Sequence, residues 1–292
     1  MSSHAILGAG GVGGFVGAVL AGAGEQVRLL LRAESLAGYP ATLTLEGPLG
    51  NVTGPVEPAR VLDTEVDVLW VTTKATQIQA ALGAVPDPAL ARMVVPLLNG
   101  VDHVGRLRAR FGDKRVVPGT IAGELERTAP GRIVLRSPFV RFAFAAAGEQ
   151  SLAGVAGILT RFGCTCRFDG DELTLLWRKL VMLAPMALNT TAAGRAVGEL
   201  WADPEWARRF EEVAREACAV AGALGAKVDV EEIVRMLRGF PGSLRSSMQK
   251  DVAAGRPPEL DAIAGPILRG GVRYGIPVPV TAGLVAMIER PR

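Results

Sequence analysis

The chain has 292 residues, of which 49% are hydrophobic and 21% are charged, and its formal net charge at pH 7 is +3. This length suits about two domains, each large enough to bury its own core. Basic and acidic residues are interspersed, a pattern that argues against a nucleic-acid-binding surface. Glycine or proline interrupts the longer apolar stretches, so we expect no membrane-spanning segment.

Cysteine and histidine usage excludes further classes. The three cysteines, Cys164, Cys166 and Cys218, form neither a Cys-x-x-Cys motif nor a disulfide framework, so we interpret them as reduced thiols of a cytoplasmic protein. The two histidines, His4 and His103, are too few for a histidine-based metal site. We therefore expect neither a bound metal nor a histidine relay.

The most informative segment lies within the first 32 residues. A short apolar strand over 5–7 leads into a glycine-rich stretch over 8–13, and a helix over 15–20 and a second strand over 27–31 are predicted to follow. This order of strand, glycine turn, helix and strand is the context in which the dinucleotide-binding fingerprint operates.

Each glycine of that stretch has an expected role. Gly8 should form the tight turn, Gly10 should let the backbone approach a pyrophosphate, and Gly13 should let the helix pack on the strand. The pyrophosphate would bind the free N–H groups at the helix N-terminus. The residues predicted to hold it are Gly8, Gly10, Gly11, Val12 and Gly13.

The end of the second strand bears on which dinucleotide binds. An NAD site usually has Asp or Glu there, which accepts hydrogen bonds from the ribose hydroxyls. Here the residue is Arg32, whose guanidinium suits the 2′-phosphate of NADP(H). In the alternative interpretation, Glu34 turns back to the ribose and Arg32 is only solvated. The sequence favours NADP(H).

Strands and helices alternate through the first half of the chain, which predicts an α/β fold with a Rossmann-type doubly wound sheet. The further strands are expected at 42–46, 51–53, 66–72, 93–97, 116–121, 132–135, 141–145 and 164–168, with helices from 76, from 102 and over 152–162. We assign residues 1–169 to this NADP-binding domain.

Residues 170–292 are predicted to form an all-helical domain that carries substrate and catalysis. Helical spacing of apolar residues is found over 171–191, 204–224, 230–237, 260–274 and 280–288. Asp171 is a good N-cap, and Pro204 follows Asp203 at the first position of the next helix. A cleft beside such a domain is a usual place for a small substrate.

Two polar residues follow neighbouring strands of the predicted sheet. Lys74 comes just after the strand at 66–72, and Asn99 comes just after the strand at 93–97. Because ligands of open α/β sheets bind outside the carboxyl ends of the strands, we expect both side chains at the ligand.

The helical half contains two further candidates. Lys179 lies on a helix that is otherwise rich in apolar residues, and burying an unpaired ammonium is costly, so it must reach water or a ligand. Glu259 is expected in the first turn of a helix, where a carboxylate is favoured. Ser247 lies in the segment before it.

With these residues in place, the chain resembles the ketopantoate reductases, also called 2-dehydropantoate 2-reductases, over most of its length. The matching elements are Gly8-Ala9-Gly10-Gly11-Val12-Gly13, Arg32, Lys74, Asn99-Gly100, Trp177-Arg178-Lys179-Leu180, Ser246-Ser247-Met248, Arg256-Pro257-Pro258-Glu259-Leu260-Asp261 and Gly275-Ile276-Pro277-Val278-Pro279. The glycine motif alone would be weak, whereas the ordered set is specific.

The resemblance implies an NADPH-dependent enzyme that passes hydride to a 2-oxo acid. It also implies that Lys179 is the general acid and that Ser247 and Glu259 bind substrate, with Glu259 part of the catalytic pair. Lys74 and Asn99 would lie at the cofactor and substrate. A ketone that accepts hydride builds negative charge on oxygen, which a nearby ammonium stabilises and protonates.

The chain departs from the family at positions that usually carry asparagine. Leu183, Ala187 and Ala264 stand there instead, so we expect a less polar pocket and a substrate that is either ketopantoate or a less polar relative. Pro185 is predicted to kink the helix. Asn189 is the nearest surviving amide and is a candidate substrate ligand.

Two alternative functions stay open at this point. One is an NADP-binding redox sensor without turnover, although a retained proton donor argues against it. The other is a different Rossmann dehydrogenase that oxidises a secondary alcohol, with the helical domain serving dimerisation. Helical second domains of this size often form homodimers, but no heptad pattern here specifies an interface.

Overall fold

The computed structural model describes residues 1–290, and the chain divides into two compact units. Unit 1 comprises Met1–Leu98 and His103–Leu175, and unit 2 comprises Asn99–Asp102 and the chain from Leu176 onward. The sequence analysis placed the boundary at 169–170, whereas the units divide a few residues later, after Leu175. The reason is that Leu175 is 2% exposed and belongs to the hydrophobic core of unit 1.

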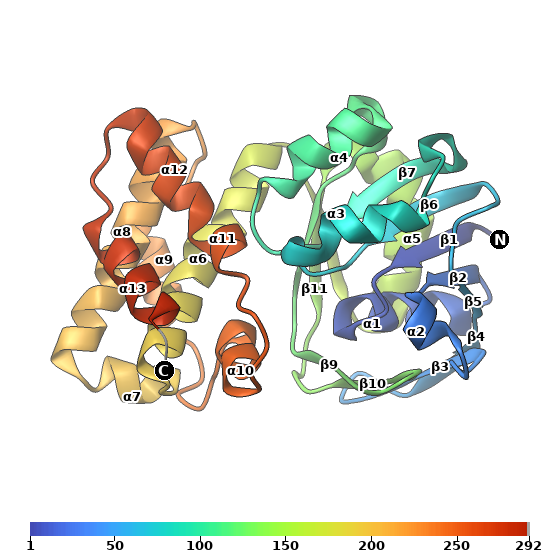
Figure 1. Cartoon of the computed structure of the whole chain (residues 1–292), viewed down its shortest axis with the longest axis horizontal. Helices are drawn as coiled ribbons and strands as arrows, with labels where there is room; N and C mark the ends of the chain where they lie inside the picture. The colour runs from blue at the N-terminus through green and yellow to red at the C-terminus, as the bar shows by residue number, and fades with distance from the viewer. Residues whose placement is uncertain (291–292) are drawn as a thin grey trace. The chain divides into compact units, whose positions relative to one another are not determined.

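Unit 1 is built on a five-stranded parallel sheet, which together with the helical second unit confirms the predicted fold class (Figure 1). Its strand order is β5-β2-β1-β6-β7. The bounds are Ser3–Leu7 for β1, Gln26–Leu30 for β2, Glu57–Ala59 for β5, Val66–Val71 for β6 and Ala91–Pro96 for β7. The order reverses between β1 and β6, and such a switch point is where open α/β sheets bind ligands.

Two smaller sheets complete unit 1. One has the order β4-β3-β10-β9 and the other β12-β11-β8. Their bounds are Thr42–Glu46 (β3), Val52–Pro55 (β4), Gly119–Ala122 (β8), Leu125–Ala129 (β9), Arg132–Leu135 (β10), Arg141–Ala145 (β11) and Thr165–Asp169 (β12). The strands β5 and β9 were not predicted, because β5 has only three residues, one of them proline, and β9 carries three polar residues among its five.

Helix α1 (Gly11–Gly22) is central to unit 1, since it contacts the large sheet and the β4-β3-β10-β9 sheet. The other helices are α2 (Ala33–Leu36), α3 (Ile78–Ala81), α4 (His103–Phe111) and α5 (Glu149–Arg161). The helix expected from residue 76 is a single α-turn between two 3-10 turns, because Gly83 and Pro86 follow directly.

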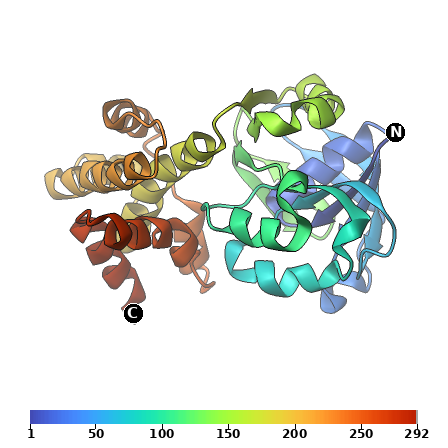
Figure 2. The same cartoon turned by 90° about the horizontal axis from the view of Figure 1, so that it is seen from above.

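The described part of unit 2 contains helices and no strand (Figures 1 and 2). The helices are α6 (Glu172–Ala193), α7 (Val197–Trp201), α8 (Pro204–Ala223), α9 (Val230–Arg238), α10 (Ser247–Ala253), α11 (Leu260–Ile263), α12 (Gly265–Tyr274) and α13 (Pro279–Glu289). Asp171 and Asp203 accept hydrogen bonds from the first turns of α6 and α8, as their sequence predicts.

One expectation for unit 2 needs correction. The single helix predicted over 260–274 is two helices that meet at Ala264, because Pro266 brings no N–H to the hydrogen-bond ladder. In addition, α7 and α10 were not predicted. Helix α6 runs through Pro185 without interruption.

Candidate active site

The glycine-rich loop of unit 1 has the geometry of a phosphate cradle. Gly8 follows β1 with φ of +107°, a conformation that glycine adopts at little cost. The Thr72 hydroxyl, just after β6, donates to the Gly8 carbonyl at 2.8 Å. A side chain at Gly8 would also collide with the backbone of Thr73. The loop is therefore fixed against the end of the neighbouring strand.

The other glycines of the loop separate into packed and open positions. A Cβ at Gly13 would overlap the Gly8 carbonyl, and one at Gly11 would overlap the Leu125 carbonyl of β9. At Gly10, by contrast, no described atom lies within 4 Å of the position a Cβ would take. Since Gly10 directly precedes the first turn of α1, this open side fits a pyrophosphate on the helix N-terminus.

Arg32 follows β2 and precedes α2, at the place where a ribose 2′ substituent is bound in this fold. Its side chain is exposed and pairs with Glu34, with Nε and Oε1 3.2 Å apart. Exposed ion pairs of this kind are worth about 0–1 kcal/mol. The pair therefore leaves Arg32 able to turn to a phosphate.

The strand ends that precede Lys74 and Asn99 are adjacent, because β6 and β7 pair with Val71 opposite Pro96. Lys74 is half-buried and precedes a 3-10 turn over Ala75–Gln77. It is the second residue after Thr72, which contacts the glycine loop. The Lys74 backbone therefore follows closely on the strand end that contacts the loop.

Asn99 belongs to unit 2, together with the three residues that follow it. Its amide nitrogen donates to Oε2 of Glu259 at 3.4 Å. Gly100 has φ of +82°, and a Cβ there would overlap the carbonyl of Ala262 in α11. The segment is therefore packed tightly against the residues that carry Glu259.

Glu259 is 8% exposed and occupies the N-cap position of α11 instead of its first turn, without a side-chain capping hydrogen bond. Its carboxylate acts electrostatically on Lys179 of α6. Lys179 is half-buried, and burial of its ammonium lowers the pKa to about 8, while the negative charge of Glu259 raises it. Asn99, Glu259 and Lys179 thus form one polar group in unit 2, which we call the acid-amide group.

Ser247 is the first residue of α10 and is exposed. The residue before it, Ser246, is buried, and its hydroxyl accepts from Gln249 N at 3.1 Å and pairs with the Thr190 hydroxyl at 2.8 Å. This link between α6 and α10 was not predicted. The Ser-x-x-Gln pattern at 246–249 is a helix-start signal that could have revealed the beginning of α10, although not its link to α6.

The positions at which the chain departs from the family pattern differ in how far they are buried. Leu183 is half-buried, one turn along α6 from Lys179. Ala187 and Ala264 are enclosed, at 0% and 1% exposure. Asn189 is also fully buried and its amide donates to the Pro185 carbonyl at 2.8 Å, so it has no surface for a ligand in this structure.

Comparison with known proteins identifies the family of the chain. A model of the ketopantoate reductase PanE/ApbA family matches residues 4–147, and a model of its C-terminal part matches residues 172–291. The chain belongs to the ketopantoate reductase family. The family consists of ketopantoate reductases, which are oxidoreductases.

Individual relatives of the family align along nearly the whole chain. A 2-dehydropantoate 2-reductase of Mycobacterium tuberculosis is 33% identical over 97% of this chain and 96% of its own. One of Caulobacter vibrioides is 30% identical over 99% of both chains. The crystal structure of a ketopantoate reductase from Ralstonia eutropha covers 98% of this chain and 97% of its own, with a TM-score of 0.86 and 28% identity.

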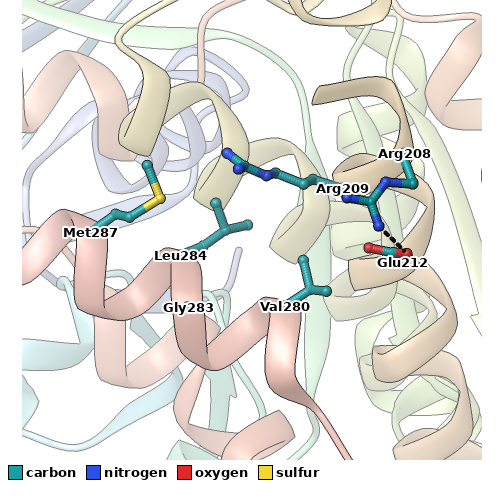
Figure 3. Close-up of a pocket in the computed structure, with 7 residues that line it drawn as sticks. All are labelled: Arg208, Arg209, Glu212, Val280, Gly283, Leu284 and Met287. Atoms are coloured by element: carbon teal, nitrogen blue, oxygen red, sulfur yellow. Dashed lines mark hydrogen bonds and ion pairs between the residues drawn. The ribbon is translucent and has the colours of Figure 1, made fainter. Parts of the chain in front are cut away.

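A surface pocket of about 200 Å³ lies elsewhere in unit 2, between α8 and α13 (Figure 3). It is lined by Arg208, Arg209, Glu212, Val280, Gly283, Leu284 and Met287. None of the predicted site residues lines it. Its arginines already have partners, because Arg208 bonds Glu212 and Arg209 pairs with Glu205.

Among residues 1–290, the structure places no group of three or more His, Cys, Asp or Glu side chains where they could hold a metal ion. In the same range, no helix has the length and apolar character needed to cross a bilayer. Burial raises the pKa of the Cys164 and Cys218 thiols to about 12, which makes both unreactive.

Proposed function

We propose that the protein is an NADPH-dependent reductase that converts a 2-oxo acid to the 2-hydroxy acid. The observation that carries the proposal is the Lys179 ammonium, whose pKa burial lowers to about 8 and on which the charge of Glu259 acts in the opposite direction. A lysine with a pKa near neutrality is suited to proton transfer, and a surface lysine would have no reason to be so perturbed.

The chemistry divides between the cofactor and the chain. When bound, the nicotinamide supplies the hydride. When the hydride adds to the carbonyl carbon, negative charge builds on the carbonyl oxygen. Lys179 stabilises that charge and donates a proton to the oxygen. At pH 7 a group with a pKa of about 8 is roughly nine-tenths protonated, so the donor is in the required state.

Glu259 and Asn99 of the acid-amide group, together with Ser247, hold the ammonium and the substrate in position. The Glu259 carboxylate counteracts the desolvation of the ammonium, which keeps Lys179 charged and in place. Asn99, whose amide donates to Glu259, has its carbonyl oxygen left to accept from a ligand. Ser247 is exposed and supplies a hydroxyl donor for the substrate carboxylate.

Cofactor binding is assigned to the residues of unit 1. The glycine loop holds the pyrophosphate, Lys74 lies beside the loop, and Arg32 binds the 2′-phosphate of NADPH in exchange for Glu34. A phosphate accepts bidentate charge-assisted hydrogen bonds from a guanidinium, whereas the exposed ion pair with Glu34 is worth only about 0–1 kcal/mol. This supports NADPH over NADH.

For the substrate, we propose a 2-oxo acid with an aliphatic side chain, used at least as well as ketopantoate. Leu183 presents an apolar surface one turn from Lys179. A pocket that offers no polar partner to a substrate hydroxyl gains nothing from it.

The test is NADPH oxidation in the presence of a panel of 2-oxo acids that includes ketopantoate, 2-oxoisovalerate and pyruvate. We expect turnover with at least one member and little turnover with NADH. Binding of NADPH without turnover of any member would contradict the proposal and favour a cofactor sensor.

A further inference from the structure

One cross-strand row of the β4-β3-β10-β9 sheet contains an arginine among apolar residues. Val52 pairs with Leu45, Leu45 with Ile133, and Ile133 with Arg127. Residues paired across neighbouring strands point to the same face of a sheet. Arg127 of β9 therefore shares a face with three aliphatic side chains.

That face is turned to helix α1. A Cβ at Gly14 would overlap Ile133, and a Cβ at Gly22 would overlap Val52, so both side chains touch the helix. Figure 1 shows β9 and β10 below α1, in agreement with the contacts between these elements. The arginine at the end of the row consequently faces α1 near its N-terminus.

The Arg127 guanidinium reaches the glycine-rich loop. Its Nη1 donates to the carbonyl of Ala9 at 3.4 Å. Two residues earlier on the same strand face, the Leu125 carbonyl packs against Gly11. The start of β9 thus forms one wall of the loop, and Arg127 is the cationic side chain on that wall.

The loop has a need for such a charge. Its residues 8–13 contain no charged side chain, and a helix N-terminus supplies only about half an elementary charge, whereas a pyrophosphate carries two negative charges. The Ala9 carbonyl is neutral, so its hydrogen bond leaves the charge of Arg127 uncompensated. A planar guanidinium also matches the geometry of phosphate oxygens.

We propose that Arg127 is a further cofactor-binding residue, which contacts the pyrophosphate of the dinucleotide at the glycine-rich loop. The inference rests on the proposed function for the presence of a nicotinamide dinucleotide. It differs from the role of Arg32, because the pyrophosphate is common to NADPH and NADH, whereas the 2′-phosphate is found in NADPH alone.

The experiment is titration calorimetry of the full chain with NADPH, NADH, ADP-ribose and adenosine 2′-monophosphate. Arg127→Ala should raise the Kd of the first three ligands by a similar factor, about tenfold or more for a lost charge-assisted contact, and leave the fourth unchanged. Arg127→Lys should recover part of the lost affinity, because it restores the positive charge but not the paired N–H donors of the guanidinium.

Arg132→Ala is the matched control, since Arg132 precedes Ile133 on β10 and is an exposed arginine on the opposite face of the same sheet. We expect the Kd values of this variant to stay within about twofold of those of the unmodified chain, because salt screens the effect of a distant exposed charge. If Arg127→Ala does not fold, Arg127→Met is used in its place, because methionine keeps most of the aliphatic part of the side chain and removes the charge.

Three results would overturn the inference. They are unchanged Kd values in Arg127→Ala, a loss confined to NADPH and adenosine 2′-monophosphate, and an equal loss in Arg132→Ala. Failure of the unmodified chain to bind either dinucleotide would remove the proposed function as well, whereas normal binding with an insensitive Arg127 rejects this inference alone.

Discussion

The glycine loop of unit 1 and the acid-amide group of unit 2 are built in different ways. The loop is six consecutive residues, 8–13, whose backbone conformation and four glycines make the cradle. The acid-amide group brings together Asn99, Lys179 and Glu259, which the fold must gather from distant parts of the sequence. Backbone chemistry can therefore be encoded locally, whereas side-chain chemistry depends on tertiary structure.

The largest expected effect is that of Lys179→Ala, which should affect catalysis by the acid-amide group but not cofactor binding by the glycine loop. Lys179→Ala should lower kcat by about 10²–10⁴, the range for loss of a positioned general acid, while the Kd of NADPH stays nearly unchanged. Steady-state kinetics and calorimetry on the same preparation measure both. A variant that retains a tenth of the original kcat would show that Lys179 does not carry the proton.

The next largest effect concerns cofactor binding in unit 1 and is tested at Arg32. Arg32→Ala should weaken NADPH binding by about ten- to 150-fold, equivalent to roughly 1.5–3 kcal/mol for one charge-assisted contact, and leave NADH nearly unaffected. Calorimetry with both cofactors gives the ratio. Equal affinity of the unmodified protein for NADPH and NADH would refute the role of Arg32.

Gly13 tests whether the loop depends on close backbone packing. Gly13→Ala places a Cβ on the Gly8 carbonyl, and overpacking of this kind costs roughly 1–3 kcal/mol in the free energy of unfolding. Gly105→Ala in α4 is the control, because no described atom lies within 4 Å of its Cβ position. It should stabilise the protein by roughly 0.5–1 kcal/mol. Urea unfolding of both variants measures the contrast, and equal effects would contradict the packing argument.

The smallest effect concerns substrate choice at Leu183. Leu183→Asn adds an amide one turn from Lys179 and should shift the ratio of kcat/KM values towards ketopantoate over 2-oxoisovalerate by about 1–3 kcal/mol, if the amide binds the hydroxyl. Ala187 is unsuitable for the same change because it is enclosed. A clear preference for ketopantoate before any substitution would contradict the apolar pocket.

The same contrast explains how far the sequence could be interpreted. Gly8, Gly13 and the strand ends before Lys74 and Asn99 were predictable, because periodicity and turn residues act over a few positions. The lowered pKa of Lys179 was not, since it arises from burial and from Glu259 eighty residues later. Arg127 was missed because β9 is short and polar, and its face is set by pairing with Ile133.

Asn189 shows the limit of interpreting helix spacing alone. As an amide near Lys179 in sequence, it was a reasonable candidate for substrate binding. In the structure it is fully buried on α6 and its amide donates to the carbonyl of Pro185 itself. The orientation of a residue on a long helix depends on which faces its neighbours cover, and that information is tertiary.

The pH dependence of the reaction in both directions tests the central claim most directly. Because Lys179 has a pKa of about 8, kcat for 2-oxo acid reduction should fall as the pH rises through 8, while kcat for oxidation of the hydroxy acid should rise. Glu259→Gln removes the charge that raises this pKa, so both inflections should move to lower pH. A reduction rate that stays flat up to pH 10, or inflections that do not move in Glu259→Gln, would contradict the assignment of Lys179 as the proton donor.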